Sequence, residues 1–220
     1  MTGDAGGKYN SGLLTDDEQS VLNGASGTGG ASQDASQVQQ GSASELAKKL
    51  LSYRSSHKYN CDNSGDCVDL QKMVDGQSLA GSGGCQAKAL DPRVLQLLLY
   101  LIEVGNFRVG TYALCGDHGF DSPRGHSGGF AVDISSINGQ AVNQDSQAAK
   151  MEALKMDKFL NALPAPLKLS QQISWGYGNH FDSQMAATQQ YGGKLCSSSC
   201  ESIYTAAVEA QHTNHIHAGY

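Results

Sequence analysis

Two short segments, far apart in the sequence, constrain most strongly what this chain can fold into. GHSGGFAVDI places six residues between His126 and Asp133, and HTNHIHAGY supplies His212, His215 and His217 in the last nine positions. Alternation along a strand puts His215 and His217 on one face. If they lie on a strand next to the first segment, a histidine, an aspartate and a second histidine can form an open zinc site that leaves one position for water. Such a site lowers the pKa of its water to about 7, so the pattern indicates hydrolysis.

The residues around His126 and Asp133 allow this convergence. His126 ends a glycine-rich loop and Asp133 lies within the strand that follows, so the two side chains meet only if the chain curls between them. Gly125, Gly128 and Gly129 give the backbone that freedom. Apolar residues alternate with Asp133 along the strand, and the INGQ sequence after it is typical of a hairpin turn.

The segment 90–105 predicts the best-defined helix. Asp91 is the expected N-cap, Pro92 occupies the first helical position and Gly105 follows the end. Nearly every side chain between them is apolar, so this helix should lie in the core, and at about twelve residues it is too short to cross a membrane. Amphipathic helices are expected at 42–56 and 146–163. The inward side chains of the second are Met151, Leu154, Phe159 and Leu160.

Strands are expected at 107–114, 129–135 and 215–220, with a strand or loop at 171–178. These elements predict an α+β fold, in which a small antiparallel sheet bears a zinc site and is flanked by helices, over residues 45–220. Residues 1–44 contain a long run of Gly, Ser, Ala and Gln with almost nothing to bury. They should form a disordered, flexible Gly/Ser-rich tail or linker, which is either a tether for a catalytic domain or a spacer.

The charge and hydropathy of the chain argue against two classes of protein. A formal net charge of −6 leaves no basic surface for nucleic acid and gives no long-range attraction toward an anionic substrate. No apolar run approaches the length of a membrane span. The N-terminal sequence MTGDAGGKYNSG has neither a basic start nor an apolar centre, so it does not read as a signal peptide.

The six cysteines favour disulfides and an oxidising environment, with a thiolate metal site and free thiols as the alternatives. Two local pairs stand out, CDNSGDC at 61–67 and CSSSC at 196–200, and Cys85 and Cys115 remain. Spacing alone does not fix the pairing. CDNSGDC predicts a turn pinned by a disulfide rather than a calcium loop, because the twelve-residue spacing and its terminal Glu are missing.

GHSGGFAVDI and HTNHIHAGY together resemble the paired signatures of the D-alanyl-D-alanine metallopeptidase group. That group shares its zinc site with lysostaphin-type enzymes, penicillin-insensitive murein endopeptidases and the Hedgehog signalling domain. The pattern is H-x6-D followed by H-x-H, in frames close to HxxGxAVDI and AHxDHIHVGY. The resemblance covers residues 90–220 and is specific over the two quoted segments. It implies Zn2+ bound by His126, Asp133 and His217, with His215 beside the metal water as base or oxyanion stabiliser and His212 as an additional active-site histidine.

The chain departs from this pattern at three places. Many relatives carry an Asp or Glu as general base where this chain has Asn214, which accepts no proton at neutral pH. Proton transfer would then fall to His215, His212 or Asp117. Arg124 stands where a Ser is common, and it could hold a substrate carboxylate or simply be solvated. GTYALCGD, which leads into the loop, has no arginine where relatives that cleave D-Ala-D-Ala usually carry one.

Trp175 lies in WGYGNH, a glycine-flexed aromatic segment suited to the wall of a substrate cleft or to core packing. Sequence and resemblance together predict a zinc metallopeptidase that hydrolyses a peptide bond in the stem or cross-bridge of bacterial peptidoglycan, as an endopeptidase or a carboxypeptidase. The alternatives are a non-catalytic zinc-containing binding module and a virion-associated component that degrades the wall. The expected location is extracellular, in the cell envelope or on a virion.

Overall fold

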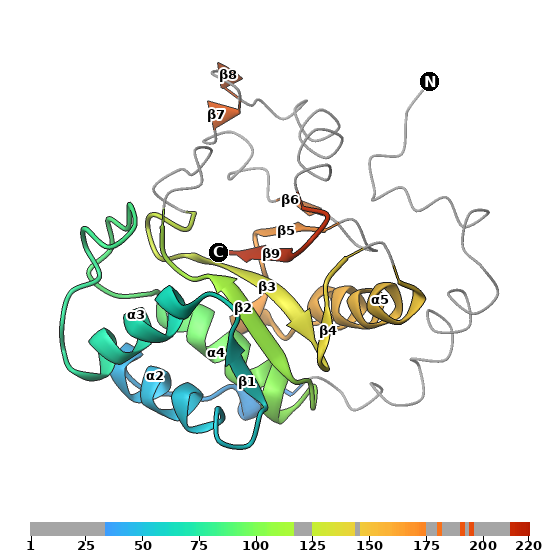
Figure 1. Ribbon diagram of the computed structural model, residues 1–220, viewed down its shortest axis with the longest axis horizontal. Coiled ribbons are helices and arrows are strands. Elements are labelled where there is room, and N and C mark those ends of the chain that lie inside the picture. The colour runs from blue at the N-terminus through green and yellow to red at the C-terminus, as the bar shows by residue number, and fades with distance from the viewer. Residues whose placement is uncertain are drawn as a thin grey trace.

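A computed structural model describes residues 34–116, 125–143, 146–174, 180–181, 190–191, 194–195 and 212–220. The described chain combines helices with one larger sheet, which confirms the predicted α+β class (Figure 1). Most of the predicted tail lies outside these ranges. Its last part contains a short 3₁₀ helix, η1 (Ala35–Gln37), followed by Val38, which is buried in the core. No helix within the described ranges is long and apolar enough to cross a bilayer.

The main sheet is built around the two segments that carry the histidines. Its strands lie in the order β1 (Tyr59–Cys61), β2 (Val109–Ala113), β3 (Ala131–Ile137), β9 (Ile216–Gly219), β5 (Gln171–Ile173) and β6 (His180–Phe181). A hairpin joins β3 to β4 (Gln140–Ala141), and a separate two-stranded sheet pairs β7 (Gln190–Tyr191) with β8 (Lys194–Leu195). β1 runs parallel to β2 and the other pairs are antiparallel, so the expected antiparallel sheet gains one parallel edge strand.

Helices gather at two sides of this sheet. The α-helices of the described chain are α2 (Ala43–Ser52), α3 (Ser64–Val74), α4 (Pro92–Glu103) and α5 (Gln147–Asn161), and a second 3₁₀ helix is η2 (Ala165–Leu167). Figure 1 shows α2, α3 and α4 beside the β1–β2 end of the sheet, and α5 beside β3 and β4.

The core is centred on α4, as its sequence predicts. The Asp91 side chain accepts a hydrogen bond from the N–H of Arg93, and Pro92 opens the helix. The buried residues of α4 are Val94, Leu95, Leu97, Leu98, Leu99, Tyr100, Leu101 and Ile102. Val132, Ile134 and Ile216 of the sheet join the same core. In α5, Leu154 and Leu160 are buried as expected, while Met151 and Phe159 are only half-buried.

The segment 61–67 differs from the expected turn. Its disulfide, Cys61–Cys67, is present, but it joins β1 to the first turn of α3, which the sequence reading missed. Asn63 caps this helix by accepting a hydrogen bond from the N–H of Gly65. A second disulfide joins Cys85 to Cys115, while 196–200 lies outside the described residues. The two disulfides suggest an oxidising environment.

Asn138 and Gly139 confirm the predicted hairpin between β3 and β4. Their φ angles are 54° and 82°, and a tight two-residue hairpin turn needs positive φ at both positions. The turn directs β4 back along the end of β3, with Ile137 opposite Gln140.

Candidate metal centre

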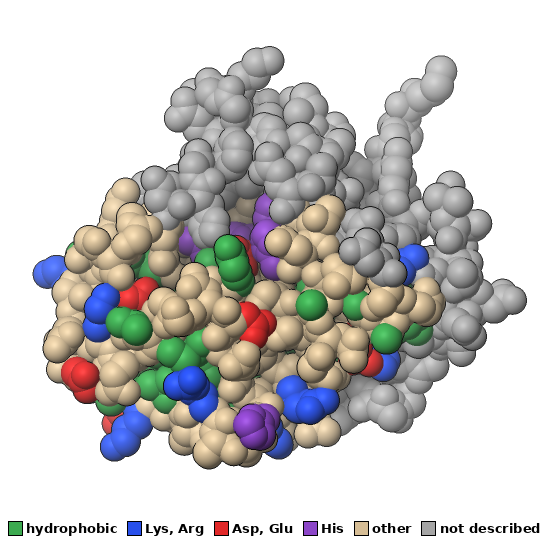
Figure 2. Space-filling view, in the orientation of Figure 1, with side chains coloured by type: hydrophobic (Ala, Val, Ile, Leu, Met, Phe, Trp, Pro, Cys, Tyr) green, Lys and Arg blue, Asp and Glu red, His purple; other side chains and the backbone are tan. Residues whose placement is uncertain are grey.

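The pairing of β3 with β9 places Asp133 directly opposite His217. Val132 and Ile134 of β3, and Ile216 of β9, point into the hydrophobic core. Because successive residues of a strand point to opposite faces, Asp133 and His217 share the other face of the sheet. Figure 2 shows histidine side chains gathered on this face, over the region where β3 and β9 meet.

A tight turn brings His126 to this cross-strand pair. The N–H of Gly129 donates to the carbonyl oxygen of His126 at 2.9 Å, and that of Phe130 donates to the carbonyl oxygen of Gly125 at 3.0 Å. Gly129 has a φ of +75°, and a Cβ added there would lie 3.1 Å from the Cβ of Ala87. The predicted curl of the glycine-rich loop therefore depends on Gly129 in particular.

The loop that carries His126 is also held from outside. The N–H of Gln86 donates to the carbonyl oxygen of Ser127 at 2.8 Å. The Cys85–Cys115 disulfide ties the same outer segment to the residues that follow β2. His126 is thus fixed by contacts on both sides of its loop, which keeps it in place against the sheet.

Three donor atoms converge at this point. His126 Nε2 lies 3.0 Å from Asp133 Oδ1 and 3.1 Å from His217 Nδ1, and His217 Nδ1 lies 3.0 Å from Asp133 Oδ1. All three residues are buried. Atoms this close can share one ion that binds nitrogen and oxygen at about 2.0–2.2 Å. The structure therefore contains a group that could hold a metal, and two imidazoles with one carboxylate suit zinc.

Gln171 of β5 sets the orientation of the His217 ring. Its Oε1 lies 3.1 Å from His217 Nε2, and since a carbonyl oxygen only accepts, Nε2 carries the proton. Nδ1 of the neutral ring then presents its lone pair to the other donors, as a metal ligand must. Gly219 makes room for this contact, because a Cβ added there would lie 3.3 Å from both Gln171 Oε1 and His217 Nε2.

Asp133 carries a negative charge in this setting. Burial by itself raises its pKa, but the charge and hydrogen bonding of the adjacent His126 side chain, together with the contact to His217, outweigh burial and hold the pKa well below its usual range. A buried carboxylate between two imidazoles provides the charge that a divalent cation requires.

His215 and His212 lie beside the donor group. His215 Nε2 is 3.6 Å from Asp133 Oδ2, and the His212 ring centroid is 4.5 Å from that of His215 and 5.8 Å from that of His217. Asn214 Oδ1 lies 2.8 Å from His215 Nδ1. With the amide oxygen as acceptor, His215 Nδ1 carries the proton and Nε2, which faces Asp133, is the basic nitrogen.

The structure does not describe the remaining predicted site residues. Arg124, Asp117 and Trp175 lie outside the described residues, so their roles stay predictions. Gln171 is the site residue that the sequence reading missed. The signal available was Gly219, whose missing side chain leaves space between two strands that the sequence does not show to be neighbours.

Comparisons with family models, with curated proteins and with solved structures find no match to this chain. The interpretation of the site therefore depends on its own geometry and on the two sequence segments described above.

Proposed function

We propose that this chain is a zinc-dependent hydrolase that cleaves a peptide bond in the stem or cross-bridge of bacterial peptidoglycan. The observation that carries the proposal is the convergence of donor atoms from His126, Asp133 and His217 to within 3.1 Å of one another. The resemblance of the two segments to the D-alanyl-D-alanine metallopeptidase group supplies the substrate class. The sequence of β2, VGTYA, carries no arginine, which favours an internal peptide bond over a terminal D-Ala-D-Ala bond.

His126, Asp133 and His217 would hold the ion through two imidazole nitrogens and one carboxylate oxygen. A zinc ion bound there supplies Lewis acidity, which makes water a nucleophile near neutral pH and polarises a carbonyl group. Gln171 keeps His217 in the tautomer that binding requires.

His215 is the group that would transfer the proton. Its Nδ1–H donates to Asn214, so its Nε2 takes the proton from the attacking water and passes it to the leaving amine. Asn214, which cannot act as a base, has a positioning role in this scheme. His212 packs against the His215 ring and limits how far that ring can turn.

Digestion of purified peptidoglycan tests the proposal. The zinc-loaded chain should release peptide-bearing fragments, identified by mass, and a chelator should stop the release until zinc is added back. His215→Ala should lower turnover by about 10²–10⁴-fold, the usual contribution of a general acid–base residue, while zinc content stays unchanged. The exposed Lys48→Ala serves as the control variant.

A non-catalytic zinc-containing binding module is the second candidate function. Asn214 favours it, because many relatives of the resembled group carry an acidic base at that position. This candidate predicts that the zinc-loaded chain sediments with peptidoglycan and releases no fragments. That result would contradict the hydrolase.

A further inference from the structure

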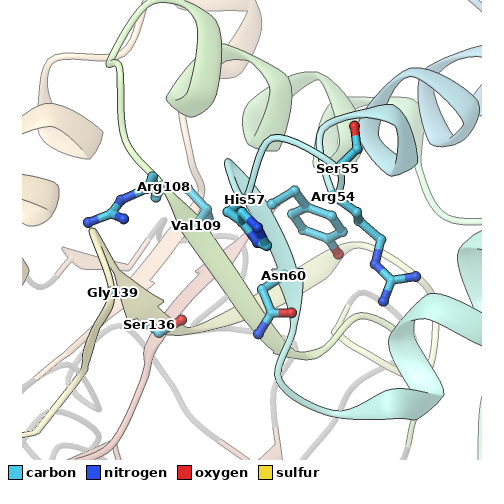
Figure 3. Close-up of a pocket in the computed structure, with 9 residues that line it drawn as sticks. Arg54, Ser55, His57, Asn60, Arg108, Val109, Ser136 and Gly139 are labelled. Atoms are coloured by element: carbon cyan, nitrogen blue, oxygen red, sulfur yellow. The ribbon is translucent and has the colours of Figure 1, made fainter.

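An open pocket of about 640 Å³ lies on the sheet and is lined by none of the residues of the candidate metal centre. Its lining includes Arg54 and His57 of the turn after α2, Asn60 of β1, Arg108 at the start of β2, and Ser136 and Gly139 at the β3–β4 hairpin (Figure 3). The proposed reaction uses none of these residues. The pocket therefore calls for an explanation of its own.

The lining residues are basic and polar. Arg54 and Arg108 bring the cationic groups, and no lining residue is acidic, although the chain as a whole has a formal net charge of −6. The carboxylate of Asp62, which does not line the pocket, accepts hydrogen bonds from Ser135 Oγ at 2.7 Å and from the amide of Asn60. Figure 2 shows Lys and Arg side chains on either side of a histidine at the lower edge of this face.

The two guanidinium groups keep most of their hydrogen-bonding capacity for a ligand. Within the part of the chain that the structure describes, the side chain of Arg54 makes no hydrogen bond or ion pair. Arg108 Nη2 donates to the carbonyl oxygen of Asn138 at 2.6 Å, which holds the side chain against the hairpin and leaves its other N–H groups available. Gly139 leaves room for this arrangement, since a Cβ there would lie 3.4 Å from Arg108 Nη2.

The two arginines do not converge on one point. Figure 3 shows them at opposite ends of the pocket, with His57 and Asn60 between them. Such a layout suits an extended ligand with two separated anionic groups better than a single small anion. Guanidinium groups pair with carboxylates through parallel N–H donors, and the neutral polar groups between them suit a peptide backbone.

The pocket lies within reach of a ligand bound at the metal centre. A register shift between β2 and β3 leaves both Ile134 and Ile137 in the core. Ser136 therefore lies on the open face of the sheet, which is the face opposite the core and also carries Asp133. Ser136 is three residues beyond Asp133, about 10 Å at the rise of a strand. A peptide chain of a few residues spans that distance.

We propose that this pocket is an accessory subsite that binds carboxylates on the peptide part of the substrate. The proposal depends on the proposed function for its choice of ligand, peptidoglycan peptides with free carboxylates. Arg54 and Arg108 each pair with one carboxylate, and the bound strand extends along the open face of the sheet toward the metal centre.

Sedimentation with purified sacculi tests the subsite. The chelator-treated chain, which cuts nothing, is mixed with intact sacculi and with sacculi whose carboxylates have been amidated. The Arg54→Gln/Arg108→Gln double variant should bind intact sacculi about tenfold more weakly than the unmodified chain. Amidation of the sacculi should weaken binding of the unmodified chain to the same degree and leave binding of the double variant unchanged. Lys48→Gln/Lys168→Gln, with the same change of charge at two exposed sites, should bind like the unmodified chain.

Equal binding by the double variant, or a loss of binding that amidation does not reproduce, would overturn the subsite. Acid-stripped sacculi, which lack phosphate polymers, form the third arm, and dependence on phosphate rather than carboxylate would also overturn it. Carboxylate-dependent binding without release of fragments by the zinc-loaded chain would contradict the hydrolase and leave the subsite standing. Fragment release by the zinc-loaded chain, with equal binding by all variants, would support the hydrolase and contradict the subsite.

Discussion

Asp133 and Asp66 are two carboxylates buried to almost the same degree, 2% and 3% exposed, in different electrostatic surroundings. Asp133 on β3 contacts two imidazoles, which hold its pKa well below the usual range. Asp66 lies in the first turn of α3, where the N–H of Leu114 donates to Oδ1 at 3.2 Å and Oδ2 has no hydrogen-bond partner among the described residues. Burial raises the pKa of Asp66 to about 6, against the smaller opposing effects of Thr111 and Leu114.

The difference shows that the partners of a buried carboxyl group, and not its depth, decide its charge. Burial raises the pKa at both positions; at Asp133 the contacts with His126 and His217 reverse the effect, whereas at Asp66 the hydrogen bonds of Thr111 and Leu114 and the charge of His126 only partly offset it. A carboxylate whose charge is already stabilised is suited to bind a metal ion. Asp66 instead lowers the stability of the fold at neutral pH, because its ionised form is poorly compensated.

The largest expected effect comes from His126→Ala, which removes a partner from Asp133 and makes its surroundings resemble those of Asp66. We expect complete loss of the one bound zinc per chain after dialysis, measured by elemental analysis, and the same loss in His217→Ala. The metal-free His126→Ala chain should also lose about 3–5 kcal/mol of unfolding free energy, since a buried charge is left with less compensation.

His57→Ala is the matched control, because this histidine is exposed and is not one of the three donor residues. It should retain one zinc per chain. Retention of stoichiometric zinc by His126→Ala would show that the ion binds at another site.

Asp66→Asn should change the unfolding free energy by a smaller amount and in the opposite direction, as a gain in stability at neutral pH. Burial raises the pKa of Asp66 in the folded chain to about 6, above its ordinary value of 3.8. The contribution of protonated Asp66 to the unfolding free energy is therefore fully present below pH 4 and is lost as the pH rises to 6. At about 1.4 kcal/mol for each pH unit, that loss is about 3 kcal/mol. Asparagine keeps an acceptor for Leu114 and does not ionise. Urea unfolding of the metal-free chain should therefore show the variant gaining stability over the unmodified chain between pH 4 and pH 7. A difference between the two chains that stays constant over this range would contradict the assignment.

Much of the fold could be predicted because its signals are local. The N-cap and apolar run of α4, the Asn138–Gly139 turn and the alternation along β3 each depend on neighbouring residues. The cluster of His126, Asp133 and His217, which could hold a metal, could be predicted because each residue lies in a short segment that resembles a known zinc-site signature.

The features that could not be predicted depend on contacts between segments distant in the sequence, or lie in a helix whose sequence lacks a clear helical periodicity. The polar, glycine-containing start of α3 resembles a turn, and its helix is held by the Asn63 cap and the Cys61–Cys67 disulfide. The parallel pairing of β1 with β2 joins segments far apart in the chain. Gln171 reaches the site because β5 pairs with β9, a pairing that neither strand's own sequence specifies.

The smallest of the three effects is expected from a change at Gln171, which contacts His217 and so helps to orient one of the two imidazoles beside Asp133. Gln171→Leu removes the acceptor for His217 Nε2, so the ring no longer has a fixed tautomer. Loss of such a partner typically weakens metal binding by about 10–100-fold, and competition with a chromogenic chelator would measure it. Gln172→Leu is the matched control, because this neighbouring buried amide donates to Asp157 and not to a histidine. It should lower stability and leave zinc affinity unchanged. Equal zinc affinity in the two variants would mean that His217 is oriented by the strand pairing alone, and that the charge of Asp133 is sufficient to hold the ion.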